Sequence, residues 1–112
     1  MAFTTATVVR TEQGNKQFQG AFSDMWALTL TLNPSSIAAA GEDTTTLTIP
    51  GVALGDIVIA YSAGVDQTVD ADINMFVSAA NAVIIRISNL HASSALDLGS
   101  STWKVLIGRP AW

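Results

Sequence analysis

The sequence predicts an all-β protein, an antiparallel β-sandwich or jelly-roll-like domain with an extended N-terminal arm. Between Thr44 and Asn89, short segments rich in Ile, Val and Thr alternate apolar and polar residues, which is typical of strands. Gly, Pro, Asn and Asp interrupt these segments about every eight to twelve residues, as turns do in a sandwich or barrel. At 112 residues, the chain is the size of one domain with one modest core.

Six strands follow from this pattern, at residues 26–32, 44–49, 56–61, 73–77, 82–88 and 102–107, and Phe3, Val8 and Val9 could make a further, first strand, for about seven or eight in all. Residues 1–25 are interpreted as the arm and residues 26–112 as the sandwich domain. The segment 73–88 is expected to form a hairpin through Ser78-Ala79-Ala80-Asn81. The segment 56–61 is apolar on both faces and is therefore expected to be central. The expected core consists of Leu28, Leu30, Leu47, Ile49, Ile57, Ile59, Val77, Val83, Ile85 and Val105.

Charge is sparse in this chain. Charged residues make up 12% of the sequence and the formal net charge is −4, while Thr and Ser contribute 12 and 10 residues. The five basic residues are scattered, so we expect no nucleic-acid binding. No apolar run reaches the length of a membrane span, so we expect no membrane partner. A neutral surface of this kind favours contact with other protein.

The residues that carry chemistry do not form a recognisable site in the sequence. His91 is the single histidine and follows a strand, where a surface position is ordinary, and cysteine is absent. Asp66, Asp70 and Asp72 could offer carboxylates to a calcium ion, but a solvated acidic loop explains their spacing better. Asp56 is expected to bond the backbone of its own loop. We therefore expect no enzyme activity, no cofactor and no metal site.

Aromatic residues at the two ends of the chain are the candidate partner-binding residues. Phe3, Phe18 and Phe22 punctuate the N-terminal region, which is otherwise polar in its second half. Trp112 follows Arg109-Pro110 at the other end of the sequence. Docking on a neighbouring subunit is one role for these four side chains, and packing beneath the chain's own sandwich is the alternative.

Residues 26–107 resemble small β-sandwich virion proteins of tailed bacteriophages, particularly the head-decoration (cement) proteins of phages that infect cyanobacteria. Three segments carry the resemblance: LNPSSIAA (32–39), TTTLTIPGVALGDIVI (44–59) and FVSAANAVIIRISNLHASS (76–94). The chain departs from the pattern at residues 63–71, where relatives carry a Pro/Gly-rich loop and this chain carries Asp.

The resemblance implies a structural protein without enzyme activity. It implies a homotrimer that binds the major capsid protein on the capsid surface of the virion, is assembled in the host cytoplasm and stabilises the phage head. A tail or fibre/adhesion component would have the same composition and remains an alternative. A carbohydrate-binding β-sandwich module is a second alternative, which would require exposed, coplanar aromatic rings, with Trp26 and Trp103 as the candidates.

Overall fold

The computed structural model of the chain describes residues 5–13, 21–64 and 71–112. These residues form seven strands and no helix. No helix among them is therefore long and apolar enough to cross a membrane. The strands are β1 (Thr5–Gln13), β2 (Phe22–Asn33), β3 (Glu42–Thr48), β4 (Ile57–Ser62), β5 (Ala71–Ala79), β6 (Ala82–Asn89) and β7 (Ser101–Pro110).

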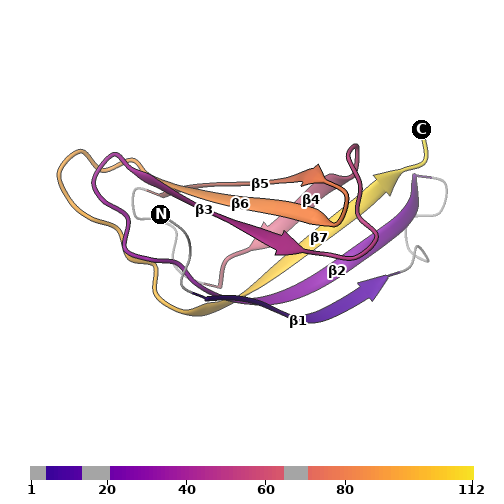
Figure 1. Cartoon of the computed structure of the whole chain (residues 1–112), viewed down its shortest axis with the longest axis horizontal. Helices are drawn as coiled ribbons and strands as arrows, with labels where there is room; N and C mark the ends of the chain where they lie inside the picture. Colours follow the sequence, from indigo (N-terminus) through magenta and orange to yellow (C-terminus); the bar gives the residue numbers. More distant parts are fainter. Residues whose placement is uncertain (1–4, 14–20, 65–70) are drawn as a thin grey trace.

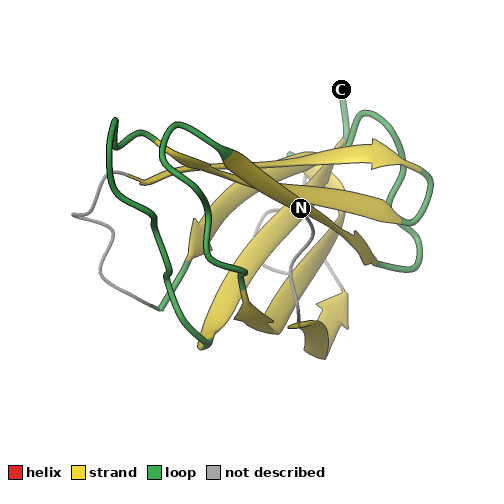
Figure 2. Ribbon diagram, turned by 60° about the vertical axis from the view of Figure 1, so that its left-hand side comes forward, coloured by secondary structure: helices red, strands yellow, loops and turns green. Residues whose placement is uncertain are grey.

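The strands build two antiparallel sheets that face each other (Figure 1). One sheet has four strands in the order β1-β2-β7-β4, and the other has three in the order β3-β6-β5. Figure 2 shows the strands of one sheet crossing those of the other. The predicted all-β sandwich is thus confirmed. Within the span assigned to an arm, Thr5–Gln13 forms β1 and pairs along β2, and β2 begins at Phe22.

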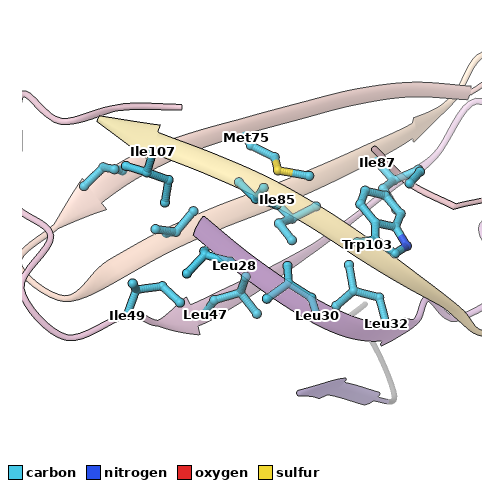
Figure 3. Packing of buried hydrophobic residues seen from close by; sticks show 14 of the residues in the cluster. Leu28, Leu30, Leu32, Leu47, Ile49, Met75, Ile85, Ile87, Trp103 and Ile107 are labelled. Atoms are coloured by element: carbon cyan, nitrogen blue, oxygen red, sulfur yellow. The ribbon is translucent and has the colours of Figure 1, made fainter. Parts of the chain in front are cut away.

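The core lies between the two sheets and is built from alternate residues of facing strands (Figure 3). In β6 the alternation is complete, because every second residue from Val83 to Asn89 is buried. Trp26 and Trp103 are wholly buried, so the two largest core side chains come from the neighbouring strands β2 and β7. Eight of the ten expected core residues are buried as well: Leu28, Leu30, Leu47, Ile49, Val77, Val83, Ile85 and Val105.

The expectation that residues 56–61 form a central strand is wrong. β4 is the last strand of the four-stranded sheet, paired with β7 on one side. Ile57 and Ile59, both expected in the core, are 41% and 40% exposed. An apolar run is compatible with a central strand, but the order of strands decides burial, and strand order is not encoded in the local pattern.

The hairpin between β5 and β6 is confirmed. Asn81 supplies the turn with a positive φ of 63°, a conformation that Asn tolerates better than most residues. Its amide donates to the carbonyl of Val52, and its side-chain oxygen accepts the amide of Gly51. The turn therefore also holds the connection between β3 and β4.

Candidate interaction surface

The outer face of the four-stranded sheet carries a shallow, mainly uncharged hollow. Two rows of opposed residues form it: Ala27, Leu106 and Ala60 in one, and Thr29, Lys104 and Ser62 in the next. The hollow has a volume of about 450 Å³, and Lys104 is the one charged residue among those that line it. Small and apolar side chains at these outward positions leave the backbone of three strands accessible. Such a face is suited to contact with another protein surface.

An aromatic pair continues this face toward the C-terminal end of β7. Phe22 lies opposite Pro110, and the amide of Ala111 donates to the carbonyl of Ala21 at 3.0 Å. This hydrogen bond brings the ring of Trp112 to 5.9 Å from the ring of Phe22, tilted by 58°. Trp112 is nevertheless 81% exposed. Two of the four aromatic residues singled out in the sequence are thus in contact, while Phe3 and Phe18 lie outside the described residues.

Gly108 allows side chains to lie directly on β7 beside this pair. A Cβ atom at this position would come within 2.6 Å of the Phe22 ring and 2.9 Å of Ile59 Cδ1. Glycine inside a strand often marks such a close approach. The two side chains cover Gly108, which is buried, and link the aromatic pair to the edge strand β4.

An ion pair between Arg109 and Asp56 joins the end of β7 to the loop before β4. Arg109 Nε and Nη2 donate to the two carboxylate oxygens of Asp56, both at 2.9 Å, and Nη2 also donates to the carbonyl of Gly51 at 2.7 Å. The hydrogen bonds with Asp56 raise the pKa of Arg109 above its usual value. The guanidinium also lies 5.2 Å from the ring of Trp26.

Asp56 was expected to bond its own loop, and this is confirmed, because Oδ2 accepts the amide of Ala53 at 2.8 Å. Its pairing with Arg109 was not found from the sequence. The two residues are 53 positions apart, and only the pairing of β4 with β7 brings them together.

The candidate catalytic and metal-binding residues occupy unrelated places. His91 Nδ1 accepts the amides of Ser93 and Ser94, so it holds its own loop. Asp72 is exposed on β5, opposite Ser88, while Asp66 and Asp70 lie outside the described residues. In the described parts of the chain, no group of three or more His, Cys, Asp or Glu side chains could hold a metal ion.

A buried asparagine, missed in the sequence, holds the opposite end of the sandwich. Asn89 is 2% exposed, and its side-chain nitrogen donates to the carbonyls of Ile37, Ala38 and Ser94 at 2.8–3.3 Å. Its side-chain oxygen accepts the amide of His91. Asn89 thereby joins the two long loops at the left end of Figure 1. The role of this residue is structural.

Comparison with known proteins adds no relative: no family model, no curated protein and no solved structure matches this chain.

Proposed function

We propose that this chain is a structural virion protein that decorates a phage capsid by binding the major capsid protein. The observation that carries the proposal is the exposed Trp112 ring, held on Phe22 beside a nearly uncharged sheet face. Tryptophan is among the residue types that most often anchor a protein interface, and an exposed ring beside an apolar face can become the centre of such a contact. The resemblance of residues 26–107 to capsid-decoration proteins supplies the kind of partner.

The physical character of this face suits attachment at many equivalent positions on a shell. Each contact is small, so stable decoration would come from many copies acting together. Because the hollow holds a single charged residue, Lys104, ionic strength should have little effect on attachment. The homotrimer implied by the resemblance remains part of the proposal, to be tested by measuring the mass of the purified protein.

The two tryptophan rings that a carbohydrate-binding module would need on its surface are buried. Trp26 and Trp103 are both 0% exposed, so neither ring can stack on a sugar. Tyr61 is partly exposed, but its ring already stacks on Trp103, with centroids 6.2 Å apart. A tail or fibre role remains the second candidate, since it would use the same apolar face on a different virion protein.

The experiment compares two substitutions of exposed apolar residues at opposite ends of the molecule. Trp112→Ala is expected to weaken binding to capsids that lack the protein by at least about tenfold, because it removes the anchor ring. Leu90→Ala is the matched control, since Leu90 is 65% exposed and directly follows β6, which ends on the side of the sandwich away from the C-terminus in Figure 1. Cryo-electron microscopy of the particles measures occupancy, and circular dichroism checks that both variants remain folded.

Decorated particles should also release DNA at a higher temperature than bare ones. Decoration should survive about 1 M salt, at which the Debye screening length is about 3 Å. Failure of the wild-type protein to bind capsids would contradict the capsid proposal and favour the tail or fibre role. Equal loss of binding in Trp112→Ala and Leu90→Ala would show that the aromatic pair is not the anchor.

A further inference from the structure

In the part of the chain that the structure describes, the outer edge of β4 is an unpaired sheet edge without charged residues. Among the described residues, no strand pairs with it, so its outward N–H and C=O groups are available to an added strand. The six residues of β4 carry no charge. Ile57, Ile59 and Tyr61 are each 38–41% exposed, and Leu54, in the preceding turn, is 72% exposed.

The edge strands of the three-stranded sheet, β3 and β5, carry exposed acidic residues of the kind that discourage pairing between sheets. β3 begins with the exposed Glu42, and β5 contains the exposed Asp72. Because the chain carries a net charge of −4, two copies approaching through acidic edges would repel each other. β4 carries no charge, so two copies can meet along it without placing like charges together.

A groove beside β4 provides room for the side chains of an added strand. It has a volume of about 440 Å³ and lies between β4 and β5, the neighbouring edge strands of the two sheets. Its apolar lining includes Val58, Tyr61, Ile73 and Met75. An extended, uncharged strand with an aromatic or branched side chain fits this groove.

A β-bulge gives β4 a pattern that is symmetric about its midpoint. Val58 pairs with Ile107 and Ala60 with Leu106, so Ile59 is the extra residue, and its side chain lies over Gly108 on the outer face. Val58 and Tyr61 face inward, where Val58 packs on the core and Tyr61 on Trp103. The faces from residue 57 to 62 therefore read outer, inner, outer, outer, inner, outer.

We propose that two copies of this chain pair through β4, antiparallel, about a two-fold axis between Ile59 and Ala60. Directly opposed residues of an antiparallel pair lie on the same face of the sheet. When a strand pairs with its own copy, its order of inner and outer residues must therefore be the same read in either direction. The bulge makes β4 meet this condition. Val58 then lies opposite Tyr61 of the second copy, a β-branched residue against an aromatic one, which is a favourable cross-strand pair.

The expected contact is weak and joins two four-stranded sheets into one continuous sheet. A six-residue strand and its flanking side chains cover less than the roughly 800 Å² per partner of a standard interface. We therefore expect a dissociation constant of about 10–100 μM for free protein. Because the contact is two-fold, it converts a single chain into a dimer and would link one trimer to another. It does not depend on the capsid proposal.

Cysteine pairing tests this register, because the chain has no cysteine of its own. Ile57 lies opposite Ser62 of the second copy, while residue 57 of one copy lies far from residue 57 of the other. Under mild oxidation, an equimolar mixture of Ile57→Cys and Ser62→Cys full-length proteins should therefore form at least about fivefold more disulfide-linked dimer than either protein alone. Thr46→Cys, at an exposed position of β3, replaces Ile57→Cys in the control mixture.

A charge placed at the axis provides a second, non-covalent measurement. Two copies of Ile59→Lys would place two lysines together, so dimerisation of the full-length chain in sedimentation equilibrium should weaken at least about tenfold. Thr46→Lys should leave it unchanged.

Three outcomes would overturn the β4 contact. The first is that the wild-type chain shows no association at about 1 mM. The second is that the control mixture forms as much disulfide-linked dimer as the test mixture. The third is that the protein forms a trimer whose association constant is the same in Ile59→Lys. The last outcome would leave the capsid proposal intact, whereas loss of capsid binding in Trp112→Ala without any effect on dimerisation would leave the β4 contact intact.

Discussion

β6 and β4 are similar in sequence and very different in position. AVIIRISN and IVIAYS are both rich in Ile and Val, and both were expected to contribute side chains to the core. β6 is the middle strand of its sheet, and Val83, Ile85 and Ile87 are wholly buried. β4 is an edge strand, with Ile57, Ile59 and Tyr61 all partly exposed. The apolar residues of a strand therefore show which side chains could be buried, but the position of the strand in its sheet determines which of them are buried.

The two strands are also held in place by different chemistry. β6 ends at Asn89, a neutral side chain that is 2% exposed and bonded to two loops. β4 is preceded by Asp56, a charged side chain that is 3% exposed and paired with the partly exposed Arg109. Substitutions in and beside the two strands should therefore differ both in size and in their response to salt.

The largest expected difference is between truncations within the two strands. Ile85→Ala should lower the free energy of unfolding by about 2–5 kcal/mol, because the buried side chain leaves a cavity. Ile59→Ala should cost less than about 1.5 kcal/mol, because solvent already reaches that side chain and no closed cavity forms. Urea denaturation at low micromolar protein concentration measures both, below the range in which copies should associate. Equal losses would show that β4 is as buried as β6.

The next effect is at the end of β6. Asn89→Ala should cost about 1–3 kcal/mol, because the loop carbonyls of Ile37, Ala38 and Ser94 lose their donor in a buried place. The loss should be the same in low and high salt, since no charge is involved. The control is Asn74→Ala, an exposed amide on β5, for which we expect a change within about 0.5 kcal/mol. A marked salt dependence for Asn89→Ala would contradict this account.

The smallest effect is expected at the start of β4. Asp56→Asn removes one charge of the bidentate pair with Arg109 and should cost about 1 kcal/mol at low salt. Since Arg109 is 37% exposed, the loss should shrink as salt screens the pair. Glu42→Gln is the control, because Glu42 lies 4.0 Å from Arg86 and both side chains are exposed, so we expect almost no change. Identical losses for Asp56→Asn and Glu42→Gln would show that the bidentate geometry adds no stability.

Much of the fold and part of the candidate surface could be predicted from the sequence. The alternation in Ala82–Asn89 identified a strand with one buried face, and Asn81 marked the hairpin turn. Phe22 and Trp112 were both chosen as partner-binding candidates, but nothing in the chain between them indicated that their rings would touch. Asn89 and Arg109 were missed because each bonds a segment about 50 residues away in the sequence, Ile37 and Ala38 for Asn89 and Asp56 for Arg109.

By itself, the sequence determined that this protein is a β-sandwich, which side chains of most strands face the core, and that its surface carries little charge. Periodicity and turn chemistry act over a few residues, so they can be recognised without knowing the rest of the molecule. Tertiary structure alone decided that β4 lies at an edge, that its bulge makes its pattern symmetric, and that Trp112 rests on Phe22. These features depend on which strands become neighbours, and that is settled by the packing of the whole chain rather than by any one segment.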